Sequence, residues 1–260
     1  ILTDSGGYQV FSLRDTISSL DEAGVTFRSV YDGSDARFTP EGAAEIQCRL
    51  GSDIAMCLDI CLPAGAPQKE LERAVRLTTV WAERQVDAAR APGQLRFGIS
   101  QGGTDDELRR QSLEEISSLP FDGFALGGLW VGEGRKLGLE MVEADCGRFP
   151  VDRPRYLMGV GHPVDVIEAV ARGVDMFDCV LPTRNARRGT VFISTGRLVV
   201  LEDGGVEVVK ANGQTELRGN DVWMLLPDGA DRDVQSDGVI RILSVRDTSA
   251  EPTGIVFDAS

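Results

Sequence analysis

The chain has 260 residues, of which 27 are Lys or Arg and 41 are Asp or Glu, so its formal net charge is −14. With 42% hydrophobic and 26% charged residues, the composition is that of a folded globular protein and excludes wholesale disorder, collagen and coiled coil. The sequence has no run of about 18 apolar residues, so no membrane-spanning helix is expected. The acidic balance excludes nucleic-acid binding by bulk charge, and any RNA partner would need a local basic patch.

Short apolar runs alternate with segments of helical period as far as about residue 193. The predicted strands are 1–3, 54–58, 95–100, 123–126, 155–160 and 174–181, and the predicted helices, caps included, are 39–51, 67–90, 105–117 and 162–173. In the first helix, Thr39 is suited to the N-cap, Pro40 to the first helical position and Gly51 to the end. Near-continuous apolar strands joined by helices predict an α/β protein with a parallel sheet. About six strand–helix units are visible, whereas a closed barrel needs eight.

Two segments break this alternation. Residues 25–38 hold two short β-type runs around an Asp32-Gly33 turn, which predicts a β-hairpin inserted in a strand–helix loop. From Thr195 onward the helical period is lost, and short runs separated by Asp and Gly predict a β-rich tail of uncertain fold, antiparallel if it folds. The runs of this tail are 197–201, 206–209, 222–226, 239–245 and 254–257.

The chain has five cysteines and one histidine, His162. Scattered cysteines in odd number, without a secretory leader, are typical of a reduced, cytoplasmic protein. The spacing of Cys57 and Cys61 could suit a metal, but Cys57 lies in an apolar run and a structural zinc site needs four ligands, so no metal site is expected. The chain begins with Ile1 inside a predicted strand, and we therefore expect it to be a piece of a longer protein.

Polar residues and glycines recur where the predicted strands end. They are Asp4, Asp59, Gln101, Gly127-Gly128, Gly159 and Gly161, with Asp178 inside the last strand. Because the carboxyl ends of barrel strands face one mouth, these residues are expected to converge. Carboxylates, a carboxamide and glycine backbone suit a flat polar heterocycle, on which Tyr8 could stack. Each acid taken singly could instead be a helix cap or turn residue, so the pattern alone leaves the chemistry open.

Six motifs in order along residues 1–198 carry a family resemblance. They are Asp4-Ser5-Gly6-Gly7-Tyr8-Gln9-Val10, Leu58-Asp59-Ile60-Cys61-Leu62-Pro63, Phe97-Gly98-Ile99-Ser100-Gln101-Gly102-Gly103, Gly127-Gly128-Leu129-Trp130-Val131-Gly132-Glu133, Tyr156-Leu157-Met158-Gly159-Val160-Gly161 and residues 175–184. Together they resemble the bacterial queuine/tRNA-guanine transglycosylases. The resemblance implies an incomplete TIM (β/α)8 barrel, and a pentosyltransferase that exchanges guanine at the wobble position of tRNA for the 7-deazaguanine preQ1 in queuosine biosynthesis.

The same resemblance assigns roles to individual residues. Asp178 matches the nucleophile that attacks ribose C1′, and Asp4 matches the general acid/base for the leaving and incoming bases. The implied substrate-binding residues are Tyr8, Asp59, Gln101, Gly128, Leu129, Met158 and Gly159. Asp59 and Gln101 would pair with the base edge after the base is flipped out of its stack, and Tyr8 and Met158 would sandwich the ring. Arg184, Arg187 and Arg188 would form the local RNA-binding patch, the alternative being a solvated basic turn.

The chain departs from the family pattern at several places. Trp130 stands where the family usually has a small residue, so its indole is expected to narrow the pocket for the 7-substituent, and Val131 matches the bacterial form. The family's early barrel strands have no counterpart, nor has its zinc lobe, so the zinc expected in the full-length family has no ligands here. We expect a barrel portion at residues 1–198 and, at residues 199–260, a tail foreign to the family, from a frameshift or a fused β module.

Three alternative interpretations stay open. The chain could be a catalytically silent, base-binding homologue, or a fragment that does not fold because open sheet edges leave backbone groups unpaired. It could also exchange a base elsewhere on tRNA or on DNA. As partners, the resemblance implies tRNA, guanine and preQ1, possibly a second copy in a homodimer, and no membrane.

Overall fold

The computed structural model describes residues 1–7, 12, 14–29, 31–193, 196–200, 206–210, 215–219, 223–225 and 231–233. The chain divides into two compact units, Ile1–Cys179 and Val180–Ser260, and each is described by itself. These two units are defined by which residues pack together. The predicted boundary at residue 198 is of another kind, because it marks where the resemblance to the family ends, and it stays a prediction.

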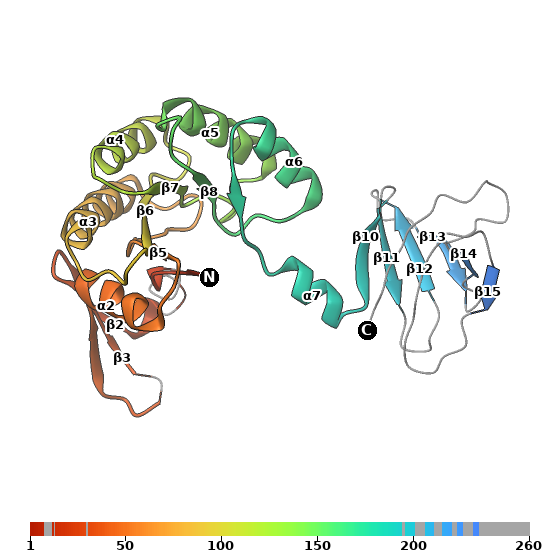
Figure 1. Ribbon diagram of the computed structural model, residues 1–260, viewed down its shortest axis with the longest axis horizontal. Coiled ribbons are helices and arrows are strands. Elements are labelled where there is room, and N and C mark those ends of the chain that lie inside the picture. Colours follow the sequence, from red (N-terminus) through yellow and green to blue (C-terminus); the bar gives the residue numbers. More distant parts are fainter. Residues whose placement is uncertain are drawn as a thin grey trace. The chain divides into compact units, whose positions relative to one another are not determined.

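A six-stranded parallel sheet forms the centre of the first unit (Figure 1). Its strands lie in chain order: β1 (Leu2–Thr3), β5 (Ile54–Met56), β6 (Leu95–Ser100), β7 (Gly123–Leu126), β8 (Arg155–Leu157) and β9 (Met176–Phe177). The sheet curls, and its carboxyl ends lie at one edge as in half of a barrel. The α/β class and the incomplete barrel predicted from the sequence are confirmed.

Among the described residues of this unit, five α-helices connect or flank these strands. They are α2 (Pro40–Leu50), α3 (Gln68–Val86), α4 (Asp106–Ser117), α5 (Arg135–Arg148) and α6 (Pro163–Ala171), and Figure 1 shows α3 to α6 following the outside of the curl. Helix α2 begins as predicted, because Thr39 Oγ1 accepts the Gly42 N–H over 3.1 Å, and it ends at Gly51, which has φ +66°. Helix α5 is missing from the sequence-based prediction. Glycines and acidic residues inside α5 obscure its apolar period.

The core lies between the sheet and these helices. Strand residues Phe97, Ile99 and Phe124 are completely or almost completely buried, together with Ile116 of α4. The ring of Phe124 stacks on that of Phe149, with 5.3 Å between the ring centroids. Because the central strands are covered on both faces, their sequences are almost continuously apolar rather than alternating.

An antiparallel sheet of three strands is inserted between β1 and α2. It consists of β2 (Ile17–Asp21), β3 (Gly24–Arg28) and β4 (Asp35–Phe38), preceded by the 3-10 turn Arg14–Thr16. The predicted hairpin corresponds to β3 and β4, whereas β2 was not predicted. The buried Trp81 of α3 joins this insert to the core, because its indole N–H lies 3.2 Å from both Asp21 O and Glu22 O.

The second unit begins with helix α7 and continues with antiparallel strands. Its elements are α7 (Leu181–Arg187), β10 (Thr190–Ile193), β11 (Gly196–Val200), β12 (Val206–Lys210), β13 (Thr215–Gly219), β14 (Trp223–Leu225) and β15 (Asp231–Asp233). Strands β10 to β13 form one sheet and β14 pairs with β15. The predicted runs 239–245 and 254–257 lie outside the described residues. Among the helices described in either unit, none has both the length and the apolar character needed to cross a bilayer.

The predicted strand 174–181 is too long. Strand β9 ends at Phe177 and α7 starts at Leu181, so Asp178 follows the strand instead of lying within it. Pro182, in the first turn of α7, is compatible with a helix start but lacks the N–H that a central strand requires.

Candidate active site

The carboxyl edge of the sheet collects the polar residues that the strand-end pattern singles out. Asp4 follows β1, Asp59 follows β5, Gln101 follows β6 and Asp178 follows β9. Asp4 lies near enough to both Asp59 and Asp178 for their like charges to interact. The structure therefore brings together three acids that lie far apart in the sequence.

Asp59 is buried and held by two neighbouring side chains. Gln101 Nε2 donates to Asp59 Oδ2 over 2.6 Å, and Ser5 Oγ lies 3.4 Å from Oδ1. Burial, and after it the negative charge of Asp4, raises the pKa of Asp59 to about 7 in spite of these hydrogen bonds. A carboxyl group with a pKa of about 7 exists in both its protonated and its ionised form near neutral pH. It can therefore donate a hydrogen bond to a polar ring or accept one from it. Sequence reasoning missed Ser5, although it directly follows Asp4.

Asp4 lies at the rim of this group, where the residue keeps contact with solvent although protein surrounds much of its carboxyl group. Desolvation by the surrounding protein raises its pKa above the ordinary 3.8, the Ser5 N–H that donates to Oδ1 over 2.8 Å opposes this, and Asp178 adds a further increase. Asp4 is therefore more ready to hold a proton than an ordinary surface aspartate. That property suits a group which gives and takes protons.

Asp178 is held by the strand next to its own. The hydroxyl of Tyr156 donates to Asp178 Oδ1 over 2.6 Å, and the Gly159 N–H donates to the same oxygen over 2.8 Å. Burial, and then the contact with Asp178, raises the pKa of Tyr156, so the phenol stays protonated. Sequence reasoning assigned no role to Tyr156; the available signal was a hydroxyl within the strand that precedes the Gly159 loop.

Glycine backbone packs directly on the polar side chains of the site. A Cβ added to Gly127 would lie 2.5 Å from Gln101 Nε2, and one added to Gly128 would lie 2.5 Å from Gln101 Oε1. Gly128 also has φ +67°, which side chains rarely adopt. Leu129 follows with its side chain buried. The loop after β7 therefore forms a wall so close to Gln101 that a side chain at either glycine would require the Gln101 amide to shift.

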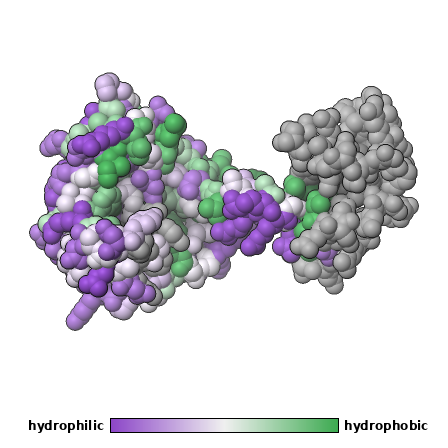
Figure 2. Space-filling model, turned by 90° about the horizontal axis from the view of Figure 1, so that it is seen from below, coloured by the Kyte–Doolittle hydropathy of each residue, from purple (hydrophilic) through white to green (hydrophobic). Residues whose placement is uncertain are grey.

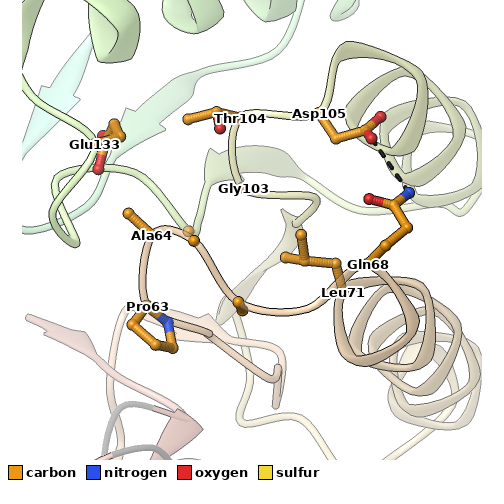
Figure 3. A pocket seen from close by; sticks show the side chains of 11 residues that line it. Pro63, Ala64, Gln68, Leu71, Gly103, Thr104, Asp105 and Glu133 are labelled. Atoms are coloured by element: carbon orange, nitrogen blue, oxygen red, sulfur yellow. Dashed lines mark hydrogen bonds between the residues drawn. The ribbon is translucent and has the colours of Figure 1, made fainter.

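A cavity of about 260 Å³ adjoins this wall (Figure 3). Its lining comes from the loops after β5, β6 and β7 and from the first turns of α3: Pro63, Ala64, Gly65, Ala66, Gln68, Leu71, Gly103, Thr104, Asp105, Gly128 and Glu133. Gln68 Nε2 donates to Asp105 Oδ2 over 3.2 Å at one side of the cavity. Because Gly128 belongs to both, the cavity is continuous with the wall beside Gln101.

Trp130 directs its ring toward helix α5. A Cβ added to Gly138 would lie 3.1 Å from the indole, so the ring packs on this glycine. Trp130 has φ +56°. The backbone N–H groups of Trp130 and Val131 donate to the Glu133 carboxylate over 2.5 and 2.9 Å. These bonds hold a backbone conformation that is unfavourable for a bulky residue. Whether the indole narrows a base pocket stays a prediction.

Met158 and Tyr8 are the two residues expected to sandwich a ring, and the structure describes only Met158. Met158 is half-buried and packs against the main hydrophobic cluster beside the Gly159 loop. Tyr8 lies outside the described residues. The stacking roles of both stay predictions.

The predicted basic patch lies in the second unit. Arg184 and Arg187 are in the last turn of α7, Arg188 is its C-cap, and all three are exposed. The α7 sequence contains no acidic residue, and its surface is mainly hydrophilic in Figure 2. The three arginines therefore form one exposed basic segment.

The cysteines do not resemble a zinc centre. Cys57 is fully buried and accepts the Ile99 N–H over 3.2 Å, whereas a structural zinc site needs four ligands around the metal. Within the described ranges there is no group of three or more His, Cys, Asp or Glu side chains that could hold a metal ion. The residues described here do not fit zinc, and no chemical step is assigned to it.

Curled parallel strands with acidic residues at the carboxyl edge place the chain in the class of α/β-barrel proteins, whose sites lie at the barrel mouth. The family model of the queuine tRNA-ribosyltransferases matches residues 1–211. The chain belongs to this family. A queuine tRNA-ribosyltransferase of Nitratidesulfovibrio vulgaris (strain DP4) is 54% identical over 200 residues, which are 76% of this chain and 53% of that protein.

Two further curated relatives carry the same name. The queuine tRNA-ribosyltransferase of Caldanaerobacter subterraneus subsp. tengcongensis is 53% identical over 201 residues, or 77% of this chain and 53% of that protein. The protein of the same name from Sorangium cellulosum is 52% identical over 200 residues, or 77% of this chain and 50% of that protein. The chain thus spans about half the length of the curated relatives it matches.

Proposed function

We propose that this chain carries the catalytic portion of a tRNA-guanine transglycosylase, which exchanges guanine at the wobble position of tRNA for preQ1. The observation that carries the proposal is the grouping of Asp178 and Asp4 with the Asp59–Gln101 pair at one sheet edge. The names of the relatives support the reaction class. The grouping supports the assignment of roles.

Asp59 and Gln101 are proposed to recognise the base. A guanine-type ring presents neighbouring N–H and C=O groups along one edge, and a carboxyl group beside a carboxamide complements both. Gly128 and Leu129 add backbone contacts, because glycine lets a planar ring approach the chain closely. Burial of Asp59 makes the pair selective, since a ring without matching groups would leave buried polar atoms unpaired. Met158 and Tyr8 are proposed to sandwich the ring.

Covalent exchange falls to Asp178 and Asp4. A carboxylate oxygen of Asp178 bonds to ribose C1′ while the C1′–N9 bond breaks and its electron pair moves to N9 of guanine, which takes a proton from Asp4. In the second half, the incoming base gives its proton to Asp4 and bonds to C1′, which releases the Asp178 carboxylate. The raised pKa of Asp4 suits it to both transfers.

RNA contact falls to the arginines of α7. Arg184, Arg187 and Arg188 follow the nucleophile closely in sequence and are exposed. Guanidinium groups pair with phosphates, and a local cluster can hold RNA in spite of the net charge of −14. The substrates are tRNA, guanine and preQ1, and a homodimer is the proposed assembly.

Incorporation of labelled guanine into unmodified tRNA tests this function. The 260-residue chain is expected to incorporate label, a preQ1 chase to release it, and Asp178→Asn to slow exchange by on the order of 10³ or more. Asp152→Asn is the control, because the Asp152 side chain is 73% exposed. Guanine binding without exchange would favour the silent homologue. Label at another position of tRNA, or in DNA, would favour the other exchange reactions.

A further inference from the structure

Two hydrogen-bond donors hold the Asp178 carboxylate by the same atom. Tyr156, the middle residue of β8, is 3% exposed, and its hydroxyl lies 2.6 Å from Asp178 Oδ1. The Gly159 N–H donates to Oδ1 over 2.8 Å. Within the part of the chain that the structure describes, both hydrogen bonds of this carboxylate converge on Oδ1, and Oδ2 receives neither.

We infer that Tyr156 is a positioning residue for Asp178, which fixes the carboxylate through Oδ1 and leaves Oδ2 as the atom that bonds to ribose C1′. The inference rests on the proposed function, because it needs a covalent step at Asp178. Two donors on one oxygen stop the carboxylate from rotating, so Oδ2 points in a constant direction. The rigid ring of Tyr156, anchored in a buried strand, supplies one of these donors.

The hydrogen bond from Tyr156 also affects the step in which the Asp178 carboxylate is released from ribose C1′. In the first step, Oδ2 bonds to C1′, the C1′–N9 bond breaks, and guanine leaves with its electron pair and a proton from Asp4. In the second step, the N9 position of the incoming base bonds to C1′, its proton goes to Asp4, and the C1′–Oδ2 bond breaks. Negative charge then returns to the carboxylate, where a hydrogen bond to an anion is strongest. Tyr156 keeps its own proton throughout and should favour the second step.

The loop after β8 also contacts the residue that follows Asp178. Gly161 lies against Cys179, since a Cβ added to this glycine would be 1.8 Å from the cysteine sulfur. Residues 159–161 thus contact both Asp178 and Cys179, while the Tyr156 hydroxyl holds Asp178 from the preceding strand. The backbone supplies one donor whatever the side chains are. Tyr156 is the contact that a substitution can remove.

Tyr156→Phe tests the inference, because it keeps the ring and removes only the hydroxyl. Tyr31→Phe is the matched control, since Tyr31 is 97% exposed. We expect Tyr156→Phe to lower kcat for guanine exchange by about 10- to 100-fold with little change in KM for guanine. The enzyme–tRNA adduct retained on a denaturing gel during turnover should rise as a fraction of the enzyme, because the ester breaks more slowly.

Each other result has a distinct meaning. Equal kcat and equal adduct in Tyr156→Phe and wild type would overturn the inference and leave the proposed function standing. A proportional loss of adduct and turnover with a lowered Tm would show a merely structural role and also overturn it. A wild-type chain that forms no adduct and exchanges no guanine contradicts the proposed function itself, and the inference falls with it.

Discussion

The side-chain amide of Gln101 donates a 2.6 Å hydrogen bond to Asp59 Oδ2, which links the residues that follow strands β6 and β5. Gln101 is itself held in place, because its backbone N–H donates to Ser112 Oγ over 2.9 Å. Without the Gln101 amide, the buried Asp59 carboxyl group would keep only the 3.4 Å contact with Ser5 Oγ. The pair places a carboxamide beside a carboxyl group at this edge of the sheet, which is the arrangement that the proposed base recognition uses.

Asp59→Asn should change how stability depends on pH. Burial raises the pKa of Asp59 from 3.8 to about 7, so the unfolded chain releases this proton near pH 4 and the folded chain near pH 7. The free energy of unfolding should therefore fall as pH rises through this interval. The variant should lose less stability, by on the order of 1–3 kcal/mol, in urea titrations from pH 4 to 8. The control Asp152→Asn should follow the wild type, and identical slopes for all three proteins would refute the prediction.

Gln101→Leu should weaken guanine binding. The change removes the donor to Asp59 and the proposed partner of the base edge, and a lost hydrogen bond to a charged or strongly polar group corresponds to about a 10- to 100-fold rise in Kd. Isothermal titration calorimetry with guanine measures it. Gln111→Leu on the exposed face of α4 is the matched control. Equal affinity for both variants would remove Gln101 from the proposed binding role.

Arg109→Met should strongly destabilise the first unit. Arg109 and Asp145 form an ion pair in which both side chains are fully buried, and Arg109 Nη1 also donates over 3.1 Å to Gly103 O and to Gly127 O. Removing one partner leaves a buried charge unpaired, which costs about 3–5 kcal/mol. Urea denaturation should show this loss and a substantial recovery in Arg109→Met/Asp145→Leu. A double variant no more stable than the single one would argue against the pairing.

Gly161→Ala should disturb the segment that carries Asp178, the proposed nucleophile. The added methyl group would lie 1.8 Å from Cys179 Sγ, so the chain next to Asp178 must shift, at a cost of about 1–3 kcal/mol. Gly147→Ala in α5 is the control, because nothing lies within 4 Å of its added Cβ. That control should stabilise by about 0.5–1 kcal/mol. Thermal unfolding of the two variants should therefore move in opposite directions.

The sequence by itself determined the features that depend on neighbouring residues. The cap at Thr39, the end of α2 at Gly51 and the turn at Asp32-Gly33 are local, so their residue types were sufficient to predict them. The order of strands and helices followed from hydrophobic periodicity, and motif spacing led to the family. Periodicity failed at α5, whose glycines and acids blur the pattern, and at β9, whose neighbour Asp178 lies beyond the strand end.

Only the tertiary structure decided which side chains meet. The Tyr156–Asp178 bond and the Arg109–Asp145 pair join residues 22 and 36 positions apart. No local preference encodes these contacts, because they arise from strand order and from helix packing against the sheet. The shifted pKa values of Asp4 and Asp59 have the same origin, since desolvation and charge–charge interactions depend on distances in space. The sequence names the acids of this site, whereas the fold decides which acid is buried and which carboxylate oxygen the neighbouring donors contact.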